Sequence, residues 1–118
     1  MAKLSLATLG QIDGFMVAAL VDSGSGLALA TLGSGIDLEL AAAGNTEVLK
    51  AKVRVANALK LNDEVEDLLI TLGHQYHLIR PLESNKEMFL YVVLDRKRAN
   101  LAMARHELKR FEKELDFS

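Results

Sequence analysis

YHLIRPL (residues 76–82) and MFLYVVLD (residues 88–95), followed by ANLAMAR (residues 99–105), are the segments from which the architecture can be worked out. The first two are short apolar runs, rich in β-branched and aromatic residues, on either side of a polar turn at residues 83–85. They predict two hairpin-linked strands, over residues 75–82 and 86–95. A helix is predicted from Ala99 onwards, because apolar residues then recur every three or four positions in a single stripe: Leu101, Ala104, Leu108, Phe111 and Leu115.

A third strand is predicted just before this hairpin, over residues 64–72. It begins with acidic residues and ends in an apolar run at residues 68–72, after which Gly73 and His74 form a turn. The three strands then form a meander. Pro81 has no N–H group to donate to a neighbouring strand, so we expect it at a strand end or at a sheet edge.

The N-terminal part of the chain predicts a short helix and a second hairpin. Apolar residues at Leu4, Leu6, Leu9 and Ile12 predict an opening helix that covers the core. Residues 15–21 and 27–32 are apolar runs on either side of a turn rich in Gly and Ser, which predicts two further strands. The first of these runs is apolar at every position, so we expect a strand that is covered on both faces.

A long helix is predicted over residues 38–59, with Asp37 as its N-cap and a length of about 33 Å at 1.5 Å per residue. One apolar stripe consists of Leu38, Ala42, Leu49, Val53 and Ala56. A second stripe, rich in small residues, consists of Leu40, Ala43, Gly44, Val48, Ala51, Val55 and Ala58. A helix that rests only on its own sheet needs one stripe, so the second predicts contact with the same helix of another subunit. Gly44 and Asn45 in mid-helix fit either close packing of two backbones or a local kink.

The predicted order is αββαβββα, which places the chain in the α+β class. We expect a single domain over residues 1–118 that folds as a three-layer α/β/α sandwich. Its five-stranded antiparallel sheet carries the long helix on one face and the two terminal helices on the other. A chain of 118 residues that is 50% hydrophobic can form one such core without disulfides.

Composition limits the classes of function. The chain has no cysteine, so it holds neither a disulfide nor a thiolate metal site. Its formal net charge is −2, which gives no field that attracts nucleic acid. No apolar run approaches the roughly 20 residues that span a bilayer, and the first residues do not resemble a signal peptide. We therefore expect a cytoplasmic protein that neither inserts into a membrane nor binds nucleic acid.

The usual catalytic and ligand motifs are missing from the sequence. The glycine pairs at residues 24–26 and 33–35 lack the third glycine of a dinucleotide loop and the Gly-Lys-Ser/Thr of a phosphate loop. His74 and His77 are three residues apart around a strand, so alternation sends them to opposite faces. No Gly-x-Ser-x-Gly elbow occurs. We therefore predict no catalytic residue, no cofactor and no metal site, and thus a chain that is not an enzyme.

HLIRPL (residues 77–82), LYVVLDR (residues 90–96), ANLAMAR (residues 99–105) and the opening IDGFMVAALVDSGSGLALA (residues 12–30) resemble the Roadblock/dynein light chain family. The resemblance extends over nearly the whole chain, although the long helix matches only in its apolar pattern. It implies an adaptor domain that forms homodimers or heterodimers, in which the long helices pack antiparallel and the third strands pair into one continuous sheet. The implied dimer interface consists of Leu40, Gly44, Val48, Ala51, Val55, Leu68, Leu69 and Ile70.

In bacteria, domains of this family usually regulate small Ras-like GTPases as scaffolds or activators of hydrolysis, and in eukaryotes they join dynein or lysosomal signalling platforms. The resemblance therefore implies a dimeric, non-catalytic regulator that binds a small GTPase through the outer side of the paired long helices. Two alternatives stay open, a structural light-chain-like subunit of a larger assembly and a small-molecule sensor. The expected partner contacts are Glu47, Lys50, Lys52 and Arg54 on the long helix, and Arg96, for which a solvated loop position is the alternative.

Overall fold

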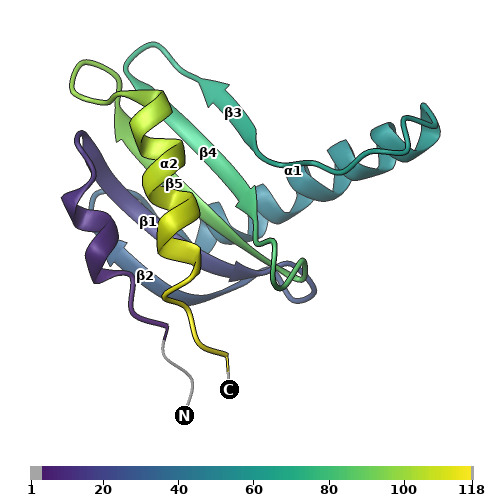
Figure 1. Ribbon diagram of the computed structural model, residues 1–118, viewed down its shortest axis with the longest axis horizontal. Helices are drawn as coiled ribbons and strands as arrows, with labels where there is room; N and C mark the ends of the chain where they lie inside the picture. The colour runs from purple at the N-terminus through teal and green to yellow at the C-terminus, as the bar shows by residue number, and fades with distance from the viewer. Residues whose placement is uncertain (1–3, 118) are drawn as a thin grey trace.

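The computed structural model describes residues 4–117 and contains one antiparallel sheet between two helical layers (Figure 1). The strands lie in the order β2-β1-β5-β4-β3. In chain order the elements are the 3-10 helix η1 (Ala7–Gln11), β1 (Phe15–Asp22), β2 (Leu27–Gly33), α1 (Leu38–Ala58), β3 (Leu68–Thr71), β4 (Gln75–Pro81), β5 (Met88–Asp95) and α2 (Leu101–Glu112). The predicted α+β class, the order αββαβββα and the five-stranded antiparallel sheet are confirmed.

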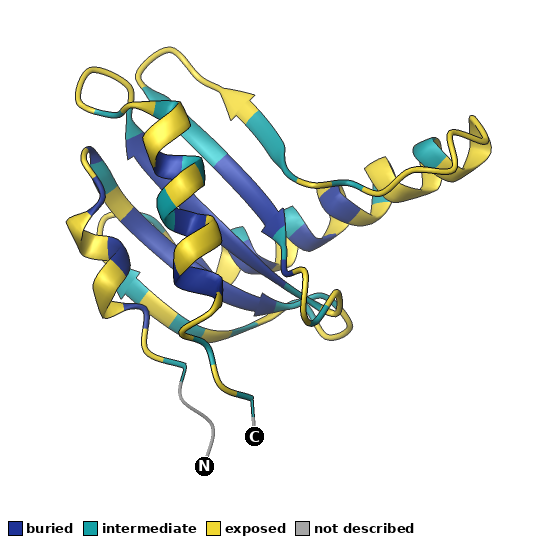
Figure 2. Ribbon diagram, in the orientation of Figure 1, coloured by how far each residue is buried: buried dark blue, intermediate teal, exposed yellow. Residues whose placement is uncertain are grey.

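Each face of the sheet has its own apolar core, and the strands between the two cores contain long buried stretches (Figure 2). The face under η1 and α2 holds one cluster, which includes Leu9, Leu20, Leu90 and Phe111. The face under α1 holds the other, which includes Val17, Leu38, Leu49, Phe89 and Tyr91. β1 lies between β2 and β5 and is buried from residue 17 to residue 21, as its uninterrupted apolar sequence predicts.

Side-chain caps fix where the two α-helices begin. Asp37 Oδ1 accepts a hydrogen bond from Leu40 N at 3.1 Å at the start of α1, as predicted. Asn100 Oδ1 accepts one from Met103 N at 3.1 Å, so α2 begins at Leu101 rather than at Ala99. Asp95 instead stabilises the preceding turn, because its Oδ1 accepts a hydrogen bond from Lys97 N at 3.1 Å.

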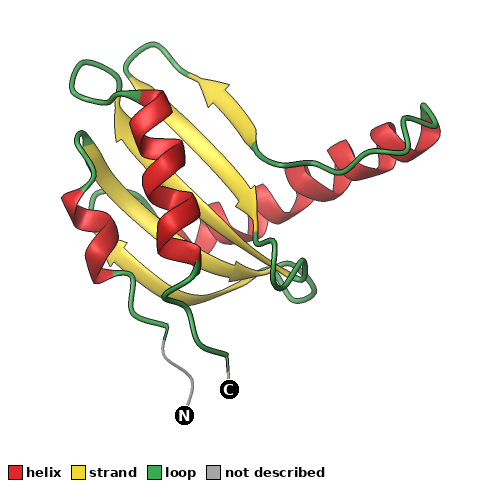
Figure 3. Ribbon diagram, viewed as in Figure 1, coloured by secondary structure: helices red, strands yellow, loops and turns green. Residues whose placement is uncertain are grey.

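Three predicted boundaries were too wide (Figure 3). β3 begins at Leu68 instead of residue 64, because the charged side chains that precede it bind other elements. Asp67 pairs with Arg105 of α2, and Glu64 pairs with Lys86 of the β4–β5 turn. β5 begins at Met88, after a turn in which Glu87 N donates a hydrogen bond to Asn85 Oδ1. The opening helix is a single 3-10 segment, although its Leu9 does cover the core as expected.

Candidate interaction site

α1 has two halves with different surroundings. Its first half packs on β1 and β2, and the buried side chains of the helix all lie there: Leu38, Ala42, Thr46 and Leu49. Its second half extends past the β3 edge of the sheet (Figure 1). Val53 was predicted to rest on the sheet, yet 41% of its surface is exposed because the helix has left the sheet by this point. Within residues 4–117, the second half of α1 therefore has no strand beneath it, and the segment of residues 59–67 that returns to β3 lies alongside it (Figure 1).

The stripe predicted for the subunit interface lies open on the outer side of α1. Leu40 is 70% exposed, Val55 48% and Val48 41%. Gly44 is exposed and Ala51 half-buried between them. A row of large exposed apolar side chains on one helix is a common mark of a protein–protein contact.

β3 forms one edge of the sheet, with β4 as its single neighbour among the strands of residues 4–117. Leu68 belongs with the core under α1, and Ile70, two residues on, lies on the same face and is exposed. Leu69 points to the other face and packs on the core under α2. The predicted interface residues of β3 are therefore split between both faces, and a partner strand would meet Leu69 through its backbone. An uncovered edge of this kind offers free N–H and C=O groups for pairing.

The cationic residues expected to bind a partner do not share one surface. Lys50 and Arg54 line a hollow of about 310 Å³, together with Ser23 and Lys86, over the apolar side chains of Leu49 and Val53. Lys52 lines a different hollow, with Leu61 and residues 63–68. Residues two positions apart on a helix lie about 200° apart, so Lys50 and Lys52 must face different sides.

Helix geometry also shows how the predicted partner contacts of α1 lie relative to its predicted dimer stripe. Lys50 lies about 200° around the helix from Val48, and Arg54 is one turn beyond Lys50. Measured from the middle of the whole apolar stripe, however, Lys50 lies about 120° and Arg54 about 80° around the helix, so the cationic flank borders the stripe. Glu47 is exposed, and at 100° per residue it lies on the outer surface beside Arg54. Lys86, in the turn between β4 and β5, also belongs to this cationic group. The sequence did not indicate this, because Lys86 is far from Lys50 and Arg54 along the chain.

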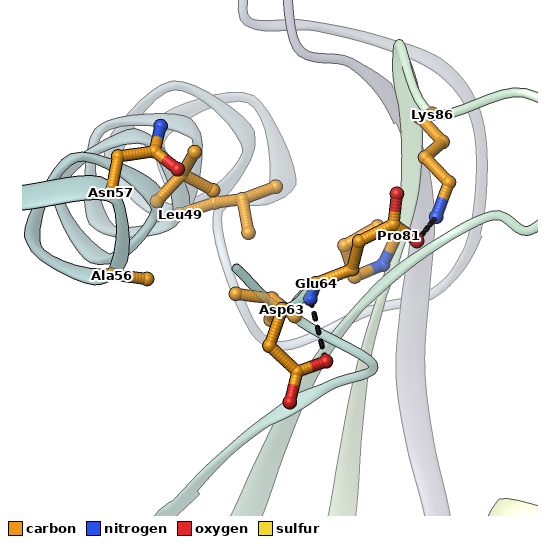
Figure 4. Close-up of a pocket in the computed structure, with 9 residues that line it drawn as sticks. Leu49, Ala56, Asn57, Asp63, Glu64, Pro81 and Lys86 are labelled. Atoms are coloured by element: carbon orange, nitrogen blue, oxygen red, sulfur yellow. Dashed lines mark hydrogen bonds and ion pairs between the residues drawn. The ribbon is translucent and has the colours of Figure 1, made fainter. Parts of the chain in front are cut away.

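An apolar groove of about 280 Å³ lies between the second half of α1 and the segment that leads into β3 (Figure 4). Its apolar lining consists of Leu49, Val53, Ala56, Val65 and Pro81. Lys86 Nζ lies 2.6 Å from Glu64 Oε2 at its rim, and Glu64 N donates a hydrogen bond to Asp63 Oδ1 at 2.9 Å. Asp63 and Glu64 thus stabilise the segment that returns from α1 to the sheet.

Arg96 has intramolecular partners. Its Nη1 donates a hydrogen bond to the carbonyl oxygen of Leu72 at 2.9 Å, and its guanidinium lies 5.3 Å from the centre of the Tyr76 ring. These contacts join the β5–α2 loop to the β3–β4 turn. Contact between Arg96 and a partner protein stays a prediction.

Two ion pairs fix α2 to the sheet, and neither was predicted. Arg80 Nε donates to Glu112 Oε1 at 2.7 Å, and both side chains are buried. Arg105 makes two hydrogen bonds to Asp67, at 2.9 and 3.1 Å, and the bond to this carboxylate raises the pKa of Arg105. The sequence separations of these pairs are 32 and 38 residues, so no local pattern could indicate them.

His77 is the centre of a polar cluster on the α1 face of the sheet. Its Nδ1 lies 2.9 Å from Tyr91 Oη, and its Nε2 lies 2.9 Å from Gln75 Oε1. Burial lowers the pKa of His77 and raises that of Tyr91, because a low dielectric disfavours the charged form of each. The cluster was missed because His77 was considered only as a metal ligand.

Other candidate sites have structural explanations. Asp22 accepts hydrogen bonds from Ser25 Oγ at 2.8 Å and from Gly24 N at 3.1 Å, and these bonds, with the Ser25 hydroxyl first, lower the pKa of Asp22. They shape the β1–β2 turn. Within residues 4–117, no three His, Asp or Glu side chains are grouped so that they could hold a metal ion. In the same part of the chain, no helix combines the length and apolar character of a membrane span.

Comparison of the fold with solved structures gives high similarity at low sequence identity. The Roadblock/LC7 domain from Streptomyces avermitilis matches with a TM-score of 0.80 at 15% identity, over 92% of this chain and 88% of that one. The gliding protein MglB from Thermus thermophilus gives 0.71 at 18%, over 92% and 86%. MglB from Myxococcus xanthus gives 0.65 at 19%, over 86% and 85%.

The likeness lies in the fold, because all of these identities are below 20%. No protein-family model matches the sequence, and a comparison with curated proteins gives no significant match. The strand order, the long helix on one face and the C-terminal helix on the other are what these structures share with this chain. The chain has the fold of a Roadblock/LC7 domain.

Proposed function

We propose that this chain forms a homodimer that binds a small Ras-like GTPase and regulates it without catalytic residues of its own. The resemblance of its sequence to the Roadblock family and the likeness of its fold to MglB support this proposal. The observation that carries it is the incomplete α1 face: the second half of α1 extends beyond the sheet with Val53 and Val55 exposed. A second copy of the chain would cover it.

Two surfaces of one chain fit such a dimer. Pairing of two β3 edges would extend the sheet under the projecting half of each α1, which would supply the layer that this half lacks. Antiparallel packing of the two α1 helices would bury Val48, Val55 and the small residues Gly44 and Ala51 between them. Pairing would also protect the β3 edge from association with other strands.

The flank of α1 that carries Lys50 and Arg54 borders the apolar stripe without belonging to it, so it would stay accessible at the rim of this dimer. We propose that this flank, with Glu47 and Lys86, contacts the GTPase. The chain would regulate the GTPase by holding the switch regions of the GTPase in position. Positioning and electrostatics dominate phosphoryl transfer, so a regulator can act by stabilising a competent switch conformation.

The dimer is tested first, by light scattering on the purified protein at micromolar concentration. Wild type should have the mass of two chains, and the double variant Val48→Lys/Val55→Lys should have the mass of one. Lysine at both positions places four cations in the interface, whereas it leaves the core under α1 unchanged. A wild-type mass of one chain would contradict the homodimer.

GTPase binding is tested by passing lysate of the native host over the immobilised protein with either GDP or a GTP analogue. A small GTPase retained in one nucleotide state would support the proposal and allow its hydrolysis rate to be measured. Retention of large assembly proteins regardless of nucleotide would instead support a structural subunit. Thermal stabilisation by a metabolite would support a sensor.

The contact surface is tested with Glu47→Ala/Lys50→Ala/Arg54→Ala, which should weaken GTPase binding and leave the dimer intact. The matched control changes the same types of charge on the opposite face of the molecule, as Lys109→Ala/Lys113→Ala/Glu114→Ala. All six side chains are exposed, so neither variant disturbs a core. Equal binding by both variants would rule out this surface.

A further inference from the structure

The hydrogen bonds of His77 are all satisfied when its ring is neutral. Gln75 Oε1 can only accept, so the ring nitrogen 2.9 Å from it, Nε2, carries a hydrogen. In the neutral ring, Nδ1 is then an acceptor, and the Tyr91 hydroxyl 2.9 Å away donates to it. Both ring nitrogens are thus satisfied while the imidazole is neutral.

A second proton would disturb this arrangement. With hydrogens on both nitrogens, Nδ1 becomes a donor and Tyr91 Oη must accept, so the hydroxyl hydrogen needs another acceptor. Asn45 of α1 also bonds Tyr91, but this bond lowers the pKa of the hydroxyl, so the Asn45 amide donates to Oη and would have to turn over before its own oxygen could accept that hydrogen. Proton uptake at His77 therefore reorients a chain of hydrogen bonds that runs from β4 through β5 to α1.

The position of His77 connects this chain to the open side of the molecule. His77 pairs with Ile70 in the register of β3 and β4, and both lie on the α1 face, next to the free edge. His77 is half-buried in the single chain. In the proposed dimer, the extended helix of the second copy would cover this part of the sheet and take the ring out of water.

Around His77, β3 contributes Ile70, β5 contributes Tyr91 and Val93, and α1 contributes Asn45. On β5, the carboxylate close to His77 in register is Asp95, which lies two residues beyond Val93, pairs with Gln75 and accepts a hydrogen bond from Lys97 N. On α1, Lys52 is the charged residue on the same side as Asn45, and it lies two turns further along the helix. A lysine near the ring would add to the cost of an imidazolium, whether it came from the same chain or from a second copy.

We propose that His77 couples dimer formation to pH, because the interface closes over a neutral imidazole and proton uptake by this ring releases the partner chain. The inference rests on the proposed dimer. It concerns a residue outside the surface assigned to the GTPase.

The direction of the effect follows from linkage. In the single chain, burial already lowers the pKa of His77 below its ordinary value of 6.5. Cover by a second copy would lower it further, so the dimer would bind fewer protons than the separate chains. The dimer therefore loses stability as the pH falls through the pKa of His77 in the separate chain, which lies below 6.5. For each unit by which dimerisation lowers the pKa, the dissociation constant rises up to about tenfold per chain, or about 100-fold for two chains.

The experiment measures the dimer dissociation constant by sedimentation at pH 7.5 and pH 5.5. Wild type should dissociate more easily at pH 5.5, by up to about 100-fold for each unit by which dimerisation lowers the pKa of His77. In His77→Asn the amide can replace Nδ1 as the partner of Tyr91 but does not titrate, so its dissociation constant should change less than about twofold. His74→Asn and His106→Asn are matched controls, because these histidines are exposed, and both should behave like wild type.

A second measurement keeps the test valid if His77→Asn folds poorly. The pKa of His77 is read by NMR in the wild-type dimer and in the monomeric Val48→Lys/Val55→Lys variant, and it should be lower in the dimer. Equal values, or a wild-type dissociation constant that does not change with pH, would overturn the role of His77 and leave the dimer standing. A wild-type protein that is monomeric at pH 7.5 would overturn the dimer and this inference together.

Discussion

The two faces of the sheet differ in how much of their covering comes from the chain itself. On one face, α2 and η1 cover a core that includes Leu20, Leu90 and Phe111, and buried Arg80 and Glu112 lock α2 in place. On the other face, α1 covers β1 and β2 with its first half and then leaves the sheet. The face under α2 and η1 is covered by contacts within the chain, whereas the face under α1 is covered only in part and could bind a second chain.

The largest effect should come from the closed face, where Glu112→Gln removes the charge that balances buried Arg80. Removal of one member of a buried ion pair costs about 3–5 kcal/mol of unfolding free energy when the other is left without compensation. The exposed Glu83, whose Oε1 lies 4.0 Å from Arg80 Nη2, still compensates part of this charge, so the cost should lie near the lower end of that range. Urea denaturation measures this cost, and it should be the same in a monomeric background. The control is Glu64→Gln, which breaks the exposed pair with Lys86 and should cost less than about 1 kcal/mol. Similar costs for both variants would mean that burial does not distinguish these pairs.

The next effect compares the two halves of α1 directly, with Leu49→Ala in the covered half and Val53→Ala in the projecting half. Leu49 is 5% exposed, so its truncation should cost about 3 kcal/mol in the Val48→Lys/Val55→Lys background. Val53 has lost its sheet, so its truncation there should cost less than about 0.5 kcal/mol. In the wild-type background, Val53→Ala should instead weaken the dimer, as measured by sedimentation.

Equal costs for Leu49→Ala and Val53→Ala in the monomeric background would contradict the division of α1. They would mean that Val53 is already packed within its own chain. If Val53→Ala in the wild-type background lowered the unfolding free energy but left the dimer dissociation constant unchanged, the second chain would bind a surface that does not include Val53.

The sequence predicted what depends on local periodicity. The apolar stripe of α1 as far as Leu49 and the all-apolar β1 follow from residues close together in the chain, and both are buried as expected. The limits of that approach appear at Val53, whose spacing matches Leu49 although the sheet ends before it. Helical spacing shows which side of a helix a residue occupies, but it cannot show how far the neighbouring sheet extends.

Contacts between segments far apart in the chain could not be predicted, because local periodicity carries no information about them. Asp67 was predicted to lie in the third strand, whereas in the structure it precedes β3 and pairs with Arg105 of α2. Lys86 joins Lys50 and Arg54 only through the fold. The separation of Lys50 from Lys52, in contrast, follows from helix geometry alone and could have been predicted.

The smallest effect concerns the free end of α1, where Lys60 has a φ of 55°. Left-handed backbone is costly for a side chain with a Cβ and is favoured by glycine at this position after a helix. Lys60→Gly should therefore raise the unfolding free energy by about 0.5–1 kcal/mol, as measured by urea denaturation. Asn62, with a φ of 52°, is the matched control, and Asn62→Gly should gain less because asparagine tolerates this conformation. A loss of stability in Lys60→Gly that occurs in the dimer but not in the monomeric background would show that the Lys60 side chain contacts the second subunit, which would extend the unfinished face to the end of the helix.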